Sequence, residues 1–181
     1  MPAKGGPMTA TMTDVDIDEI PPRDSLVRVS SPFELTRSSD GGMPTLPITG
    51  GCNCGAVRYE VTAELLGASY CHCRRCQRRS GAAASPSAHA AADAFHIVAG
   101  EEVLRMWKPE DGGEKWFCSV CGSSVFARNT EKHPEWIGVR MGTFDEDPGV
   151  RPSVRSWVGS AVAWESIPDD GLPRHVGSRY D

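Results

Sequence analysis

The stretch Cys71-His72-Cys73-Arg74-Arg75-Cys76 decides how this chain is interpreted, because it places three cysteines within six residues. Two more cysteine pairs flank it, Cys52-Asn53-Cys54 upstream and Cys118-Ser119-Val120-Cys121 downstream. These three groups contain all seven cysteines of the chain. An odd number of thiols cannot be paired completely into disulfides, and close spacing of this kind is typical of metal ligands. The pattern therefore divides the thiols into a group of four and a group of three around metal.

Length and charge narrow the class of protein. The chain has 181 residues, which is the length of one domain with an extension. Its net charge of -5 argues against a protein that coats nucleic acid, and it has no apolar run of about 18 residues that would span a membrane. Residues 1–20 lack the apolar segment of a secretory signal. We expect a cytoplasmic protein, in whose reducing compartment clustered cysteines bind metal more often than they form disulfides.

The chain divides near residue 47. Residues 1–46 combine an acidic run, Pro21-Pro22 and a segment rich in serine and glycine. Such a composition buries too little apolar surface to offset the entropy of ordering the chain. We therefore expect a low-complexity, flexible N-terminal extension over residues 1–46 and a folded domain over residues 47–181.

Residues of the folded part alternate between apolar and polar, which indicates short half-buried strands. Residues 50–55 are predicted as a turn-rich start, and residues 74–80 as one turn of helix that ends at Gly81. Residues 82–92 could form a strand or a short helix, and Pro86 favours the strand. The other predicted strands cover residues 56–63, 68–70, 95–99, 103–107, 115–118, 123–127, 136–141, 151–157 and 161–164. With no amphipathic helix and no repeat, the fold class is all-β.

Aromatic and histidine side chains outside these motifs are given structural roles. In a small β domain, tryptophans usually pack in the core or at its rim. The histidines follow no metal-binding motif, so we expect surface or core positions for them. The tryptophans are Trp107, Trp116, Trp136, Trp157 and Trp164, and the histidines are His89, His96, His133 and His175.

The group of four thiols is predicted to be a closed structural zinc site. Gly55 and Gly122 follow the two pairs and permit tight turns. A zinc held by four thiolates has no open position, and such a site contributes on the order of 10 kcal/mol to folding. The alternative is four buried thiols without a metal. The four predicted ligands are Cys52, Cys54, Cys118 and Cys121.

The group of three, Cys71, Cys73 and Cys76, is predicted to be an open site. Three protein ligands leave one tetrahedral position for water or substrate, as in a catalytic zinc. Two alternatives remain, because His72 could complete a second structural site or Cys76 could be a free thiol. We favour His72 as a spacer or as a hydrogen-bond donor outside the metal's ligands. The nearby Arg74, Arg75, Arg78 and Arg79 would lower the thiol pKa values, or they form a solvated basic surface.

Three motifs together resemble a known family, the glutathione-dependent formaldehyde-activating enzymes, which include centromere protein V. The resemblance covers about residues 48–175. It is carried by Gly51-Cys52-x-Cys54-Gly55-Ala56-Val57-x-Tyr59, Cys71-His72-Cys73-x-x-Cys76-Gln77-x-x-Ser80-Gly81 and Phe117-Cys118-x-x-Cys121-Gly122-Ser123. One departure is Arg155, which stands where this family often has a histidine.

This resemblance implies a fold, two metals and a reaction. The fold would be the Mss4-like β-tent of short antiparallel strands stapled by zinc. The group of four thiols would hold the structural zinc, and the group of three would hold the catalytic zinc. The activity would be a carbon–sulfur lyase reaction run in reverse, in which glutathione condenses with formaldehyde to S-hydroxymethylglutathione. From the chemistry of the side chains, we expect the cluster that Arg74, Arg75 and Arg78 form with Arg79 to attract the carboxylates of the glutathione co-substrate as paired donors, and the alternative is a solvated basic surface.

Two other functions compete with this hypothesis. The chain could be a non-catalytic zinc module that binds a protein partner, in which case a fourth protein ligand would close the second site. It could also be a methionine sulfoxide reductase, but such an enzyme needs a nucleophilic cysteine apart from its metal. The three spare cysteines lie too close together for that role. We assign no general base from the sequence.

Overall fold

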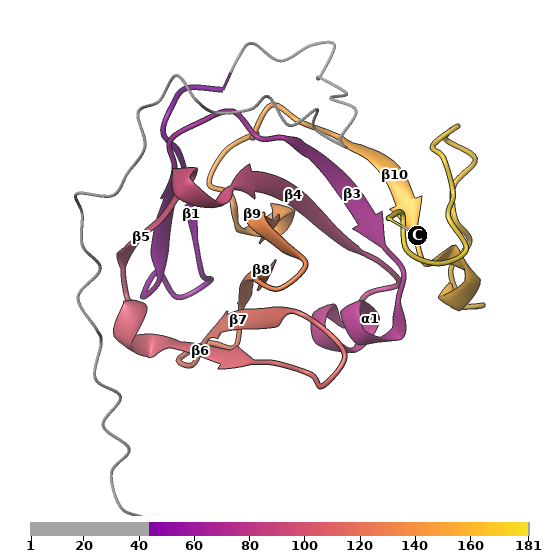
Figure 1. Cartoon of the computed structure of the whole chain (residues 1–181), viewed down its shortest axis with the longest axis horizontal. Helices are drawn as coiled ribbons and strands as arrows, with labels where there is room; N and C mark the ends of the chain where they lie inside the picture. The colour runs from indigo at the N-terminus through magenta and orange to yellow at the C-terminus, as the bar shows by residue number, and fades with distance from the viewer. Residues whose placement is uncertain (1–43, 181) are drawn as a thin grey trace, which may run out of the picture. The chain divides into compact units, whose positions relative to one another are not determined.

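This computed structural model describes residues 44–180. Their strands form two β-sheets, which short helices and loops connect (Figure 1). The smaller sheet has the order β1-β2-β5, with all pairs antiparallel. Its strands are β1 (Ile48–Gly51), β2 (Arg58–Val61) and β5 (Phe95–Ala99). The described residues are therefore dominated by strands, and the all-β fold class is confirmed.

The larger sheet has the order β10-β3-β4-β9-β8-β7-β6. Only the pairing of β10 with β3 is parallel within it. Its strands are β3 (Gly67–Cys71), β4 (Ser85–Ala91), β6 (Leu104–Trp107), β7 (Glu114–Cys118), β8 (Ser124–Asn129), β9 (His133–Arg140) and β10 (Pro152–Ser156).

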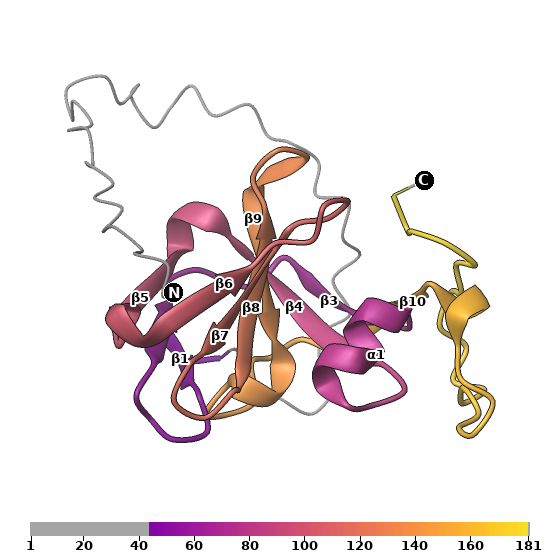
Figure 2. The same ribbon diagram turned by 90° about the horizontal axis from the view of Figure 1, so that it is seen from below.

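Short helices connect these strands. The α-helix α1 (Arg74–Ser80) lies beside the ends of β3 and β4 (Figure 2). It ends at Gly81 as predicted, because that glycine adopts the left-handed conformation that closes a helix. Four 3₁₀ turns are η3 (Ala92–Ala94), η4 (Glu101–Val103), η5 (Met141–Thr143) and η6 (Val158–Ser160). Within residues 44–180, no helix combines the length and the apolar character needed to cross a membrane.

Most predicted strands are confirmed with shifted ends, and two parts of the prediction are wrong. Residues 50–51 belong to β1 and not to a turn, because Gly50 is needed where the ring of Tyr59 lies against the strand. Residues 161–164 are not a strand. The free edge of β10 is occupied instead by the chain around residue 174, since Arg155 N donates to Pro173 O (2.9 Å) and His175 N donates to Arg155 O (2.9 Å).

The predicted N-terminal extension lies outside the described residues except for residues 44–46. The boundary near residue 47 therefore stays a prediction. The prediction of core or rim positions for the tryptophans is wrong for Trp164, which is 68% exposed, while Trp107 and Trp157 are 44% and 41% exposed and lie outside the core.

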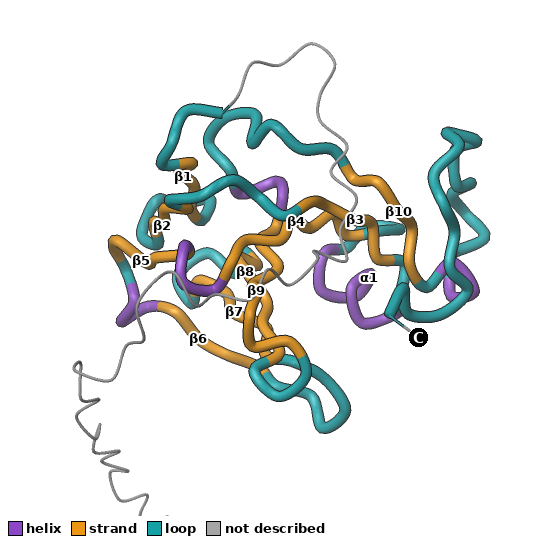
Figure 3. The backbone as a smooth tube through the Cα atoms, turned by 45° about the horizontal axis from the view of Figure 1, so that its top comes forward, coloured by secondary structure: helices purple, strands orange, loops and turns teal. Residues whose placement is uncertain are grey.

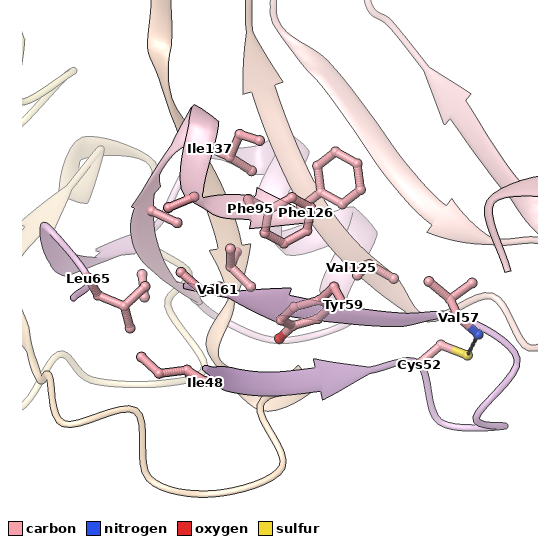
Figure 4. Close-up of a cluster of buried hydrophobic side chains, with 14 of the residues drawn as sticks. Ile48, Cys52, Val57, Tyr59, Val61, Leu65, Phe95, Val125, Phe126 and Ile137 are labelled. Atoms are coloured by element: carbon pink, nitrogen blue, oxygen red, sulfur yellow. Dashed lines mark hydrogen bonds between the residues drawn. The ribbon is translucent and has the colours of Figure 1, made fainter. Parts of the chain in front are cut away.

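One hydrophobic core joins the two sheets (Figure 4). The rings of Tyr59 from β2 and Phe95 from β5 lie 5.1 Å apart, and Phe95 lies 5.0 Å from Phe126 of β8. Tyr59 is completely buried, and its hydroxyl pairs with the hydroxyl of Thr143 (2.8 Å). Burial of each such side chain contributes roughly 1.5–3 kcal/mol, so this contact between the sheets is a large part of the folding energy.

Gly50→Ala should destabilise the fold strongly. A Cβ at this position would lie 2.2 Å from the Tyr59 hydroxyl oxygen and 2.5 Å from the Thr143 carbonyl oxygen. Overpacking of this kind costs about 1–3 kcal/mol or more. Gly142→Ala is the matched control, because a Cβ there meets nothing within 4 Å. Urea denaturation of both variants measures the difference, and equal midpoints would contradict the packing described for Tyr59.

Candidate metal centres

Four thiols converge where a hairpin of each sheet turns. Cys52 and Cys54 lie in the connection from β1 to β2, and Cys118 and Cys121 lie at the turn from β7 to β8. Each pair is followed by a glycine in the left-handed conformation, which sharpens both turns as the sequence predicted. The pairs come together although 64 residues separate Cys54 from Cys118. A metal bound here would join the smaller sheet to the larger one.

The spacing of these four sulfur atoms fits a tetrahedral thiolate site. The Sγ atoms of Cys52 and Cys54 are 3.5 Å apart, those of Cys54 and Cys118 are 3.9 Å apart, and all four lie within 4.8 Å of one another. Zn–S bonds of about 2.3 Å in a tetrahedron place sulfur atoms about 3.8 Å apart. Val57 N also donates to Cys52 Sγ (3.2 Å), drawn as the dashed line in Figure 4. The residues present therefore fit a closed four-sulfur metal site.

Hydrogen bonds favour the thiolate form at Cys52 and Cys121, whereas at Cys54 the Ala56 N–H lowers the pKa but the neighbouring thiols outweigh it and raise the pKa to about 12. The hydroxyl and backbone of Ser123 lower the pKa of Cys121 to about 5. Burial acts to raise the pKa of Cys52, but the Val57 N–H and the neighbouring thiols outweigh it, so that this pKa is lowered. Metals bind the thiolate and not the thiol, so both effects favour metal binding.

The other three thiols surround the start of α1. Cys71 ends β3, Cys73 caps the helix, and Cys76 lies in its first turn, where its N–H donates to Cys73 Sγ (3.4 Å). Their sulfur atoms also lie within 4.8 Å of one another. Hydrogen bonds from the thiols of Cys71 and Cys76 lower the pKa of Cys73 to about 2, and the contact with Cys73 raises the pKa of Cys71. Among residues 44–180, no fourth cysteine, histidine or carboxylate joins the group, which leaves it open.

His72 faces away from these thiols. Its backbone N–H donates to Ser156 O (2.9 Å), which ties the turn to the end of β10. Its ring is 4% exposed and lines a separate cavity of about 250 Å³ with Tyr70 and Arg155. The structure therefore does not bring His72 to the group of three as a ligand.

Gln77 holds the same turn in place, and the sequence analysis missed this role. Its buried side chain donates from Nε2 to His72 O (2.6 Å) and to Ser160 O (3.0 Å), while Oε1 accepts from Arg74 (2.6 Å). It thus links the turn to η6 after β10, and Figure 3 shows α1 next to β3 and β10. A buried glutamine inside a short polar helix gives no periodic signal, so only the contacts reveal its role.

Cys71 and Cys76 open on a cavity of about 320 Å³ on one face of the larger sheet. Small side chains leave the space: Ser69 and Ser87 pair across β3 and β4, and Ala127 pairs with Gly138 across β8 and β9. Five cations line the cavity and no aspartate or glutamate does, although the whole chain carries a net charge of -5. The cations are Lys115, Arg128, Lys132, Arg140 and Arg179.

Two of these cations interact electrostatically with Cys76. Burial lowers the pKa of Lys115, Arg140 lowers it further, and Cys76 opposes both effects. Arg140 is positioned by Ser87 Oγ (2.6 Å) and Ser85 Oγ (3.3 Å), and it also lines a second cavity of about 290 Å³ together with Cys76 and Arg79. A positive site of this kind attracts anions and favours thiolates.

The four helix arginines have other surroundings. Arg74 donates to Gln77, Arg75 pairs with Asp111 (2.5 Å), and Arg78 is exposed. None of these three lines either cavity that Cys76 lines. Arg79 does line the second cavity, where it donates to Ser124 Oγ (2.9 Å).

Comparison with known proteins points to one family. The profile of the family described as glutathione-dependent formaldehyde-activating enzyme matches residues 47–160. A protein of Sordaria macrospora is 28% identical over 111 residues (58% of this chain, 47% of the relative), and one of Penicillium rubens is 26% identical over 125 residues (66% and 64%). Both relatives carry the name of glutathione-dependent formaldehyde-activating enzyme, and in both names this activity is marked as unproven. The matched part of the chain thus spans about half to two thirds of the length of these relatives.

One solved structure is also similar to the described fold. It is the crystal structure of a Rhodobacter sphaeroides protein with 26% sequence identity. The match covers 71% of this chain and 99% of that chain, with a TM-score of 0.46.

Serine substitutions should separate the two thiol groups. Cys118→Ser removes a completely buried residue between the sheets, so we expect loss of one bound metal ion and loss of the cooperative unfolding transition. Cys73→Ser should also lose one metal ion, but because its site lies at the cavity the domain should stay folded. Metal analysis and circular dichroism measure both quantities. The same stability for the two variants would contradict the assignment of structural and open sites.

Proposed function

The chain belongs to the glutathione-dependent formaldehyde-activating enzyme family, and from this premise we propose that it condenses a glutathione-type thiol with formaldehyde to S-hydroxymethylglutathione. An enzyme that catalyses this condensation is classified as a carbon–sulfur lyase, and the condensation is the reverse of the lyase reaction. The observation that supports the proposal most is the open group of three thiols at a cavity lined by cations and by no carboxylate.

Zinc is the metal that we assign to both thiol groups. Soft thiolate ligands in a tetrahedral arrangement favour it over harder divalent ions. The four-thiol group would hold a structural zinc within a fold of the Mss4-like β-tent type. The group of Cys71, Cys73 and Cys76 would hold a second zinc, which supplies a Lewis acid for the substrate thiol. We place the protein in a reducing compartment such as the cytoplasm, where these thiols stay free of disulfides.

The cavity's cations provide the recognition of glutathione, which carries two carboxylates. We assign this role to Lys115 and Arg140 first, because both interact with Cys76 and neither forms an ion pair with an acidic residue among the described contacts. Arg128 already pairs with Glu114 (2.5 Å). Arginine and lysine bind carboxylates by charge-assisted hydrogen bonds. Binding both carboxylates would orient the thiol toward Cys71 and Cys76.

The proposed reaction balances without an oxidant or reductant. The thiol loses its proton, and the sulfur electron pair forms a C–S bond to the carbonyl carbon of formaldehyde. The π electrons of the carbonyl move to its oxygen, which takes up one proton and becomes the hydroxyl of the product. The contribution of the chain is to hold the two reactants together and to stabilise the thiolate with Lys115 and Arg140.

Exchange NMR of glutathione and formaldehyde tests the proposal. We expect zinc-loaded protein to accelerate their exchange beyond the spontaneous rate, and Cys73→Ser to abolish the acceleration. Lys115→Met should raise the half-saturating glutathione concentration about tenfold by removing a partly buried charge. Lys108→Met is its matched control, because Lys108 pairs with Glu131 at the surface and lines neither cavity.

The competing function is a zinc module that binds a protein partner. If the wild-type protein holds the second zinc but does not accelerate the exchange, the enzyme hypothesis is rejected in favour of that module. Equal effects of Lys115→Met and Lys108→Met would instead reject the cavity as the glutathione site.

A further inference from the structure

Trp157 has an unusual backbone conformation for a large side chain. Its φ of 60° and ψ of 35° lie in the left-handed region, and no other residue but glycine has a positive φ within residues 44–180. An L-residue with a bulky side chain pays a conformational cost there, whereas glycine or asparagine adopts this region readily. Such a cost persists only where the surroundings or the function require it.

The fold explains the backbone of Trp157 but not its side chain. Trp157 N donates to Gly177 O (2.7 Å), and Trp157 O accepts from Ser160 N (3.0 Å) at the start of η6. A glycine would make both hydrogen bonds without strain. The indole is 41% exposed, so it is only partly used in packing against the protein. A contact outside the described chain would explain why tryptophan stands here.

The position of Trp157 points to that contact. The preceding residue, Ser156, is the register partner of Cys71, and Ser156 O accepts the N–H of His72. The strand that holds the metal-binding turn therefore also sets the position of Trp157. Trp157 lines the same cavity as Cys71 and Cys76.

We propose that the Trp157 indole is a wall of the substrate site, which packs on the apolar part of the bound thiol and excludes water from the new C–S bond. This inference rests on the function proposed above and adds a substrate-contacting residue to it. The cavity supplies cations for carboxylates, but a peptide-like thiol also presents methylene groups and amide faces. An aromatic ring covers such groups well, with little entropy lost by its own side chain.

Replacing the side chain should therefore have opposite effects on stability and on binding. Trp157→Gly should melt at the same temperature as wild type or higher, because glycine relieves the backbone cost, and its zinc content should not change. Its Kd for glutathione, measured by calorimetry, should rise about tenfold or more, since the apolar contact is lost. Trp157→Phe, which keeps an aromatic ring, should stay within about threefold of wild type.

Trp164 provides the matched control. It lies in the same C-terminal region, is 68% exposed and lines none of the cavities beside Cys71, Cys76 or His72. Trp164→Ala should leave the Kd unchanged. Intrinsic fluorescence gives a second readout that needs no glycine variant: glutathione should change the emission of wild type and of Trp164→Phe, and Trp157→Phe should lose part of that change.

Three results would overturn the inference. Wild-type affinity in Trp157→Gly would remove Trp157 from the substrate site while the proposed function stands. A lower melting temperature or lost zinc in Trp157→Gly, together with an unaltered fluorescence change in Trp157→Phe, would show a structural role instead. No glutathione binding by the zinc-loaded wild type would overturn both this inference and the proposed function.

Discussion

The described structure depends on the convergence of four thiols between two hairpins. Strands β1 and β2 belong to one sheet and β7 and β8 to the other, and the sulfur atoms of their turns lie within 4.8 Å of one another. The core of Tyr59, Phe95 and Phe126 holds the same two sheets together. A metal at the thiols would close a loop of more than 60 residues, and it would stabilise the fold because it binds the four thiols that converge only in the folded chain.

With the sheets fixed in this way, the second thiol group can be held open. Two hydrogen bonds hold its turn between β3 and α1 in place. The His72 N–H donates to Ser156 O, and Gln77 Nε2 donates to His72 O. His72 is thereby kept on the far side, while Cys71 and Cys76 face the cavity. An open site requires that neighbouring ligands be kept away, and these hydrogen bonds have that effect.

The sequence predicts the group of three thiols because they lie within six residues, and it predicts the group of four because each of its two pairs occupies one tight turn. The all-β class also follows from the alternation of apolar residues, and the end of α1 follows from Gly81. The cations of the cavity could not be predicted, since Lys115 and Arg140 share a face only through the register of β7, β8 and β9.

Local composition gave wrong predictions at two places, where contacts between distant residues differ from what the local pattern indicates. The local sequence predicts a turn at Gly50 and Gly51, although the ring of Tyr59 requires glycine at position 50 in a strand. Residues 161–164 alternate like a strand, but the chain near Arg174 takes the available edge of β10. In each case a contact between distant residues decides the outcome.

The central claim is one closed and one open sulfur site in the same domain. Zinc X-ray absorption spectroscopy on protein with both sites filled tests it most directly. One site with four thiolates and one with three give a mean of about 3.5 sulfur ligands per zinc. A substrate thiol in the open position raises this mean to about 4. We predict this rise when glutathione is added. A mean of 4 before glutathione is added, or a mean of 3.5 that does not change, would contradict the claim.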